Sequence, residues 1–253
     1  MSNLNAVSSH RAFELILLVE KLPLTIDCMT SYDNIFILGT NGGRMLIYEV
    51  KLNPAPPRKL EASFEKTINA TKKPIQQLEA VKAFDILIAL FDSQIHIFDL
   101  DKFQLQYSIS KTKNCSLFAT SIASDQKLLR LCVVCKRKLQ FFYTNIMNKS
   151  SQNNNNFMEL ISDLELADTP RTIEFTKDNL VVFALKKDYY YYEIPTTSAA
   201  TSNPRQLEPR FSSGNRIEPL CEKLHNDFFV LGVDENKTLV YDTKGINLLL
   251  KYF

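Results

Sequence analysis

A hairpin-like unit occurs five times in this chain and constrains the fold more than any other feature. In each unit, an apolar run rich in β-branched and aromatic residues is followed by a short polar turn and a second apolar run, which is typical of a β-hairpin. The units begin at residues 34, 85, 128, 179 and 227, so successive starts lie 51, 43, 51 and 48 residues apart. A period of this size indicates stacked units, none of which can bury its apolar face alone. The five hairpins are 34–50, 85–100, 128–144, 179–194 and 227–243.

A further strand is predicted before each hairpin and a looser one after it. Four strands in each repeat describe one blade of a β-propeller. No apolar stripe with a 3.6-residue period persists for the ~10–12 residues that a helix needs. We therefore predict an all-β fold, a WD-like β-propeller of about five four-stranded blades that is incomplete at its C-terminus, where the last strand has barely begun at 247–253. The strands before the hairpins are expected at Ile26–Thr30, Ile75–Val81, Leu117–Ala123, Arg171–Thr176 and Ile217–Leu224, and one fourth strand at Phe103–Ile109.

The domain organisation follows from this repeat. We expect residues 12–253 to form one propeller domain and residues 1–11 to form a flexible N-terminus. Two polar, low-complexity stretches, 150–157 and 195–204, fall between predicted strands, so we expect mobile loops there. The N-terminus lacks a signal-peptide pattern, and no stretch approaches the roughly 20 apolar residues of a membrane span. We expect a cytoplasmic protein.

Charge is informative only locally, because 30 basic and 28 acidic residues leave a formal net charge of +2. In a four-stranded blade, the loop between the second and third strands lies at the same end as the connection to the next blade. Basic residues concentrate in these loops, whereas the loops at the other end, around Asp33, Phe84, Asp125, Asp178 and Asp227, have no basic cluster. We call the following set the basic rim: Arg44, Lys72, Lys73, Lys111, Lys113, Lys136, Arg137, Lys138, Lys186 and Lys187.

Two interpretations of the basic rim differ in what they predict. Lysines at hairpin tips discourage edge-to-edge pairing of sheets, but that role predicts lysines at both ends of the blades. An asymmetric distribution favours an acidic partner or an anionic membrane surface. We therefore predict the basic rim as the partner-binding site.

No set of residues predicts catalysis, a metal site or a cofactor. The five cysteines are scattered, which suits reduced thiols, and the pair in Cys132-Val-Val-Cys135 lies on a predicted strand, where positions three apart point to opposite faces. One of these two sulfurs is expected in the core. His96 alternates with isoleucines, which predicts a packed or exposed strand histidine. The sequence GTNGGR (39–44) predicts a hairpin turn and not a phosphate-binding loop, and we expect no small-molecule substrate.

Four consecutive tyrosines, Tyr189–Tyr192, raise the question of a phosphorylation tract or a base-stacking platform. The repeat places Lys186, Lys187 and Asp188 in a turn and begins a strand at about Tyr189. Tyr189 and Tyr191 should then share one face, and Tyr190 and Tyr192 the other. This predicts a packed strand, and we expect no nucleic-acid partner.

Several segments carry a resemblance to a known family, in order and at compatible spacing over most of positions 12–243. They are AFELILLVEKLPLTIDC (12–28), LGTNGGRMLIYEV (38–50), KKPIQQL (72–78), HIFDLDKFQ (96–104), SKTKNCSLFA (110–119), LRLCVVCKRKLQ (129–140), LKKDYYYY (185–192) and RQLEPR (205–210). These segments resemble the N-terminal citron homology domain of the vacuolar protein sorting-associated protein 39 family.

The resemblance implies a citron homology β-propeller without catalytic activity. It further implies a subunit of the HOPS tethering complex, peripheral on late endosomes and lysosomes or vacuoles, that engages a membrane-bound Rab GTPase and other tethering subunits before SNARE-mediated fusion. The peripheral contact with an anionic membrane is expected from the basic rim. In that family an α-solenoid follows the propeller, so this chain is expected to lack the closing blades and the solenoid. Two alternatives stay open: the related CORVET subunit, of the TGF-β receptor-associated protein type, and the regulatory citron homology domain of a signalling kinase or Rho exchange factor.

Overall fold

The structure is a computed structural model of the chain. It describes residues 16–53, 59–123, 127–145, 157–177, 179–194, 204–206, 218–223, 228–234, 237–242 and 245–250. The predicted flexible N-terminus (1–11) and nearly all of the two predicted mobile inserts (150–157 and 195–204) lie outside these residues.

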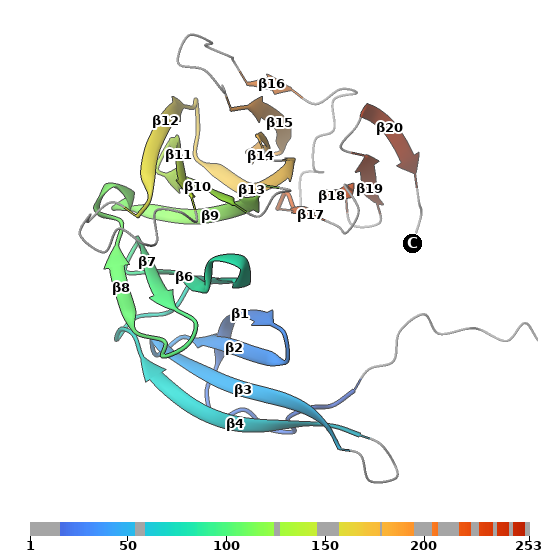
Figure 1. Ribbon diagram of the computed structural model, residues 1–253. Helices are drawn as coiled ribbons and strands as arrows, with labels where there is room; N and C mark the ends of the chain where they lie inside the picture. Colours follow the sequence, from blue (N-terminus) through green and yellow to red (C-terminus); the bar gives the residue numbers. More distant parts are fainter. Residues whose placement is uncertain are drawn as a thin grey trace, which may run out of the picture.

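Five antiparallel sheets, each of four strands in chain order, make up the molecule (Figure 1). We refer to the sheets as blades one to five. Blade one contains β1 (Ile26–Tyr32), β2 (Ile35–Thr40), β3 (Arg44–Asn53) and β4 (Lys59–Asn69). Blade two contains β5 (Gln77–Val81), β6 (Ile86–Phe91), β7 (Gln94–Asp99) and β8 (Leu105–Ser108). Blade three contains β9 (Cys115–Ile122), β10 (Leu128–Cys135), β11 (Lys138–Asn145) and β12 (Glu159–Glu165). Blade four contains β13 (Pro170–Lys177), β14 (Leu180–Leu185), β15 (Asp188–Glu193) and β16 (Arg205–Gln206). Blade five contains β17 (Cys221–Lys223), β18 (Phe228–Asp234), β19 (Lys237–Asp242) and β20 (Gly245–Leu250).

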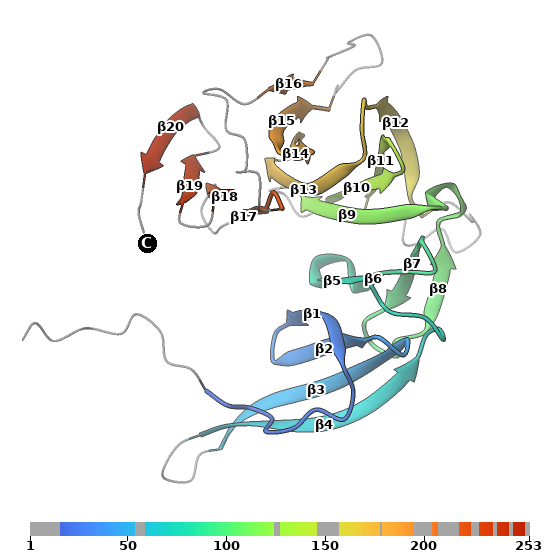
Figure 2. The same ribbon diagram turned by 180° about the vertical axis from the view of Figure 1, so that it is seen from behind.

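The blades follow one another along an open arc, which Figure 2 shows from behind. The first strands of neighbouring blades lie side by side on its inner side, for example β1 with β5 and β9 with β13. The predicted all-β fold of propeller-type blades is confirmed, and the ring formed by these strands is not closed.

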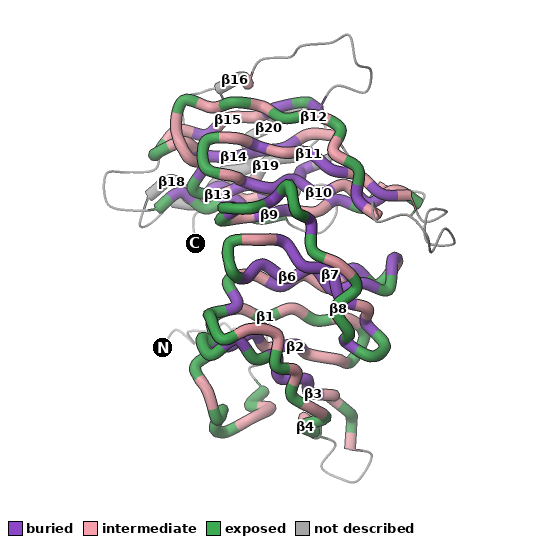
Figure 3. The backbone as a smooth tube through the Cα atoms, turned by 90° about the vertical axis from the view of Figure 1, so that its left-hand side faces the viewer, coloured by how far each residue is buried: buried purple, intermediate pink, exposed green. Residues whose placement is uncertain are grey.

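The cores lie between blades because middle strands are apolar on both faces. In β6, Ile86, Ile88 and Leu90 pack into a cluster with blade three, whereas Leu87 and Ala89 pack into a cluster with blade one. Successive side chains of a strand point to opposite faces, so a middle strand that is covered on both sides becomes a continuous apolar run. Figure 3 shows this burial along β6 and β7. Similar clusters join blade three to blade four and blade four to blade five.

The structure differs from the predictions at a few elements. Two single-turn 3-10 helices, η1 (Lys82–Phe84) and η2 (Ser110–Thr112), were not predicted, because one turn is too short to produce a helical period. The first strand of blade five was predicted over 217–224, but residues 218–220 are irregular and β17 covers only Cys221–Lys223. Pro219 lacks the N–H that a ladder needs, which accounts for the later start of this strand.

Candidate interaction surface

The basic rim begins with the tight turns between the second and third strands. Lys136 and Lys186 take the same place in blades three and four, directly after β10 and β14, and both are left-handed, with φ of 56° and 55°. In blade one, Gly43 has a φ of 75° in the corresponding turn. The predicted hairpin turn of GTNGGR is confirmed.

The connections between blades lie against these turns, as expected if both contribute to the basic rim. The Gly43 carbonyl accepts hydrogen bonds from the Ala70 and Thr71 amides, each at 3.1 Å. In blade three, the Leu166 amide donates to the Arg137 carbonyl at 2.8 Å. Second-to-third turns and outgoing connections therefore share one end of these blades.

Most cations of the basic rim are exposed, but three are held by carboxylates at the same end. Lys138 is partly buried, and its Nζ lies 2.9 Å from Glu165 and 3.5 Å from Asp163. Lys73 pairs with Asp92 at 3.0 Å, and Lys186 with Asp168 at 3.8 Å. The hydrogen bond from Lys73 is the main cause that lowers the pKa of Asp92. The sequence interpretation overlooked these acids, although three of them stand in or near the connection that follows blade three.

The remaining cations concentrate around blade three. Lys111 and Lys113 lie in the connection that enters it, and Lys136 and Arg137 form its turn. The register pairs Cys115 with Cys135, so Lys113 and Lys136 leave the sheet at the same end of that pair. We call Lys111, Lys113, Lys136 and Arg137 the basic patch. All four are exposed, and none has an ion pair with another residue in the part of the chain that the structure describes.

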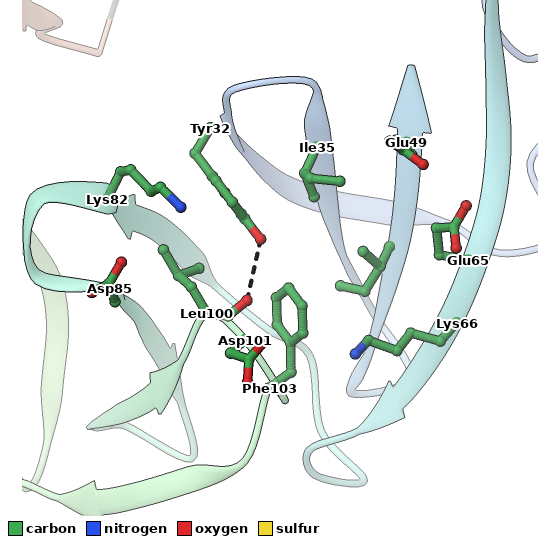
Figure 4. Close-up of a pocket in the computed structure, with 11 residues that line it drawn as sticks. Tyr32, Ile35, Glu49, Glu65, Lys66, Lys82, Asp85, Leu100, Asp101 and Phe103 are labelled. Atoms are coloured by element: carbon green, nitrogen blue, oxygen red, sulfur yellow. Dashed lines mark hydrogen bonds between the residues drawn. The ribbon is translucent and has the colours of Figure 1, made fainter. Parts of the chain in front are cut away.

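A cavity of about 710 Å³ opens between blades one and two at the opposite end (Figure 4). Its two lysines lie against aromatic rings: Lys66 Nζ is 4.7 Å from the centroid of Phe103 and Lys82 Nζ is 5.3 Å from that of Tyr32. Lys82 also pairs with Asp33 at 3.6 Å. At this end Asp125, Asp178 and Asp227 lie outside the described residues. The residues that line the cavity include both acidic and basic side chains. Among these lining residues, no nucleophile lies next to a base that could activate it.

The residues considered for chemistry are packed within the sheets. Cys132 is buried between blades three and four, and Cys135 packs towards blade two, so the predicted opposite orientation is confirmed. His96 is buried, stacks on Phe91 with ring centroids 3.8 Å apart and lies 2.7 Å, Nδ1 to Oγ, from Ser108. Desolvation lowers its pKa. Among the described residues, no group of three His, Cys, Asp or Glu side chains could hold a metal ion.

The tyrosine tract is a packed strand, as predicted. Tyr189 and Tyr191 face the core with blade five, and Tyr190 and Tyr192 face the core with blade three. The Tyr189 hydroxyl donates towards the Gly232 carbonyl at 2.6 Å and accepts from the Leu220 amide at 2.9 Å. These rings are not available as a stacking platform.

Two carboxyl groups on first strands were not anticipated. Glu79 of β5 accepts a hydrogen bond from the Thr120 hydroxyl of blade three, and burial raises its pKa. Burial, together with the charge of Glu79, raises the pKa of Glu174 on β13 to about 8. In the sequence, each of these two residues is recognisable only as a glutamate within a first strand. Their distance along the chain does not show that Glu79 of blade two and Glu174 of blade four interact electrostatically.

Four-stranded antiparallel sheets that pack face to face around an arc define a protein of the β-propeller class. Two solved structures share the fold. Sqt1 from Chaetomium thermophilum has a TM-score of 0.58 at 15% identity, over 91% of this chain and 59% of that one. The computationally designed Ika8 protein has a TM-score of 0.55 at 15% identity, over 94% of this chain and 64% of that one.

The sequence model of the CNH domain matches residues 32–245, and the chain belongs to the CNH domain family. It is 29% identical over 250 residues to the human Vam6/Vps39-like protein, covering 94% of this chain and 26% of that protein. It is 27% identical to the Vacuolar protein sorting-associated protein 39 homolog of Drosophila melanogaster, over 91% of this chain and 25% of that protein. The resemblance stated from sequence is confirmed.

The chain spans about a quarter of the length of these relatives. The fission yeast Vacuolar morphogenesis protein 6 is a more distant relative, 21% identical over 77% of this chain. In the part of the chain that the structure describes, no helix has the length and apolar character of a membrane span.

Proposed function

We propose that this chain is a non-catalytic protein-interaction module of a HOPS-type tethering subunit. It acts in the cytoplasm, peripherally on late endosomes and lysosomes or the vacuole, and engages a membrane-bound Rab GTPase before fusion. The observation that carries the proposal is the similarity to the human Vam6/Vps39-like protein over 94% of the chain, and to the Drosophila Vacuolar protein sorting-associated protein 39 homolog over 91%.

The basic patch is the contact surface of this proposal. Its four cations are exposed and lack ion pairs with described residues, so an acidic partner can pair with them without breaking contacts within the domain. Complementary charge raises association rates and excludes basic partners. An anionic lipid surface would add about 1 kcal/mol for each basic residue near it.

The test is a pull-down with the purified chain and Rab-type GTPases of late and early endosomes, each loaded with a GTP analogue or with GDP. We expect retention of a late-endosomal GTPase in one nucleotide state. Preference for an early-endosomal GTPase would instead support the CORVET alternative. Retention of none of them would refute this function.

The second candidate, a regulatory CNH domain of a signalling kinase or exchange factor, predicts a different partner. A Rho-type GTPase in the same pull-down distinguishes the two classes. The relatives named for vacuolar sorting favour the first candidate.

A further inference from the structure

Two cysteines stand opposite each other where blade three meets the basic patch. Cys115 begins β9 and Cys135 ends β10, and the antiparallel register pairs them directly, next to a bulge between Val134 and Cys135. Directly opposite residues of antiparallel strands have Cα atoms about 4.5 or 5.5 Å apart. A disulfide requires Cα atoms about 4.4–6.8 Å apart, a range that includes the usual spacing of directly opposite residues.

The two sulfurs also share one environment. Cys115 is buried and Cys135 is partly exposed, and both pack into the cluster between blades two and three. The two thiols lie close enough that each shifts the pKa of the other. Cys135 lies 3.1 Å, Sγ to Oε1, from Gln140. Cys132, the other half of the Cys-x-x-Cys motif, is buried on the opposite face and lies out of reach of this pair.

The pair has the asymmetry of an attacking and a resolving thiol. The interaction with Cys115 lowers the pKa of Cys135, whereas the interaction with Cys135 and burial raise the pKa of Cys115. Thiolates attack disulfides, and accessible thiols of lowered pKa react first. Cys135 is directly followed by the exposed Lys136, so reagents reach it from the basic patch.

We propose that Cys115 and Cys135 form a redox-sensitive dithiol that low-molecular-weight disulfides convert to an intramolecular disulfide. The Cys135 thiolate attacks one sulfur of the reagent RSSR, its S–S bond breaks, and one RS⁻ leaves with the proton that Cys135 released. The Cys115 sulfur then displaces the second RS⁻ from the mixed disulfide, and the proton of Cys115 passes to it. Two protein thiols are oxidised to one disulfide, and one RSSR is reduced to two RSH.

The disulfide would fix the ends of the basic patch to each other. Lys113 lies two residues before Cys115, and Lys136 follows Cys135, so the bond would tie the incoming connection of blade three to its turn. The inference does not depend on what the basic patch binds.

The test uses the purified chain, incubated with oxidised glutathione, alkylated at its remaining thiols, digested and analysed by mass spectrometry. We expect a cross-linked peptide pair that joins Cys115 to Cys135, lost again on treatment with dithiothreitol. Absence of this pair, or a bond that joins other cysteines instead, would overturn the proposal without the need for any variant.

Two variants test the order of the steps. Cys115→Ser should accumulate glutathione on Cys135, because the resolving thiol is missing, whereas Cys135→Ser should leave Cys115 unmodified. Cys132→Ser is the matched control and should form the Cys115–Cys135 bond as the wild type does. Circular dichroism establishes that each variant is folded. A folded Cys115→Ser variant that carries no glutathione on Cys135 contradicts the assigned roles.

Discussion

At the scale of single residues, Tyr189 shows how a conspicuous sequence feature acquires a structural role. Its ring is fully buried, and its hydroxyl reaches two backbone carbonyls and one amide of blade five. A buried tyrosine needs such partners for its hydroxyl. Tyr189 therefore joins blade four to blade five, whereas Tyr190 and Tyr192 pack towards blade three.

Replacing Tyr189 by Phe should lower the free energy of unfolding by about 1–3 kcal/mol, because the Gly232 carbonyl and the Leu220 amide lose their hydrogen bonds to the Tyr189 hydroxyl. Denaturant unfolding measures the change. Tyr191→Phe is the matched control, since Tyr191 is only partly buried and its hydroxyl has no hydrogen bond to a described residue. Equal effects of the two substitutions would contradict the assigned role of the Tyr189 hydroxyl.

Glu174 makes the stability of the chain depend on pH. Its pKa is raised from 4.5 to about 8, so the folded state holds a proton that the unfolded state releases between these values. The contribution of Glu174 to stability is therefore neutral below about pH 4.5 and becomes increasingly unfavourable as the pH rises to about 8.

Glu174→Gln removes this ionisation and should stabilise the chain by about 1–2 kcal/mol at pH 8, a value reduced for solvent screening. At pH 4.5 the substitution should have little effect. Thermal unfolding across this range measures the difference, with Glu20→Gln at an exposed position as the control. A pH-independent difference between Glu174→Gln and wild type would show that burial does not perturb this carboxyl.

At the scale of elements, the basic rim consists of the turns between second and third strands and the connections between blades. Gly43 shows how closely a turn and a connection pack. A Cβ at this position would meet the Thr71 carbonyl oxygen and lie 2.7 Å from that of Lys73, in a residue whose φ is 75°. At the adjacent Gly42, a Cβ would meet no atom within 4 Å. Of these two glycines, Gly43 is therefore the one that the close approach of the connection to the turn requires.

Gly43→Ala should therefore cost about 2–4 kcal/mol of stability, from the left-handed φ and from displacement of the connection. Gly42→Ala should change stability by no more than about 0.5 kcal/mol. Chemical denaturation of the two variants provides the comparison. Similar stabilities would mean that blade one and its outgoing connection do not approach as closely as described.

Hairpins and their period could be predicted from sequence because alternation and turn residues are local properties. The shared end of turns and connections followed from topology alone. The acids that hold Lys73, Lys138 and Lys186 were missed, since an ion pair depends on side-chain direction across a loop. The pairing of Cys115 with Cys135 could not be predicted, because it depends on the register between two strands. The Cys132-Val-Val-Cys135 motif relates two cysteines of a single strand and gives no information on that register.

At the scale of the whole molecule, exposed cations at the two ends of the blades allow the effect of position to be separated from that of net charge. Lys113 and Arg137 of the basic patch lie at one end, and Lys59 and Lys102 stand at third-to-fourth connections of the other. All four side chains are exposed, so reversing the charges of either pair alters the net charge equally while changing only one surface.

Lys113→Glu combined with Arg137→Glu should weaken binding of an acidic GTPase by about 10–100-fold, whereas Lys59→Glu with Lys102→Glu should leave it nearly unchanged. Titration of the GTPase found by pull-down, at fixed salt, measures both variants. Equal losses would mean that net charge alone determines binding and that neither end is a specific surface.

The most direct test of the central claim is hydrogen–deuterium exchange of the chain with and without that GTPase. The account predicts slower exchange in 109–116 and 134–140, the two segments that contain the basic patch, and unchanged exchange at 50–53, 59–61 and 99–104, which lie at the other end. Protection confined to 50–53, 59–61 and 99–104 would contradict the assignment of the basic rim as the interaction surface.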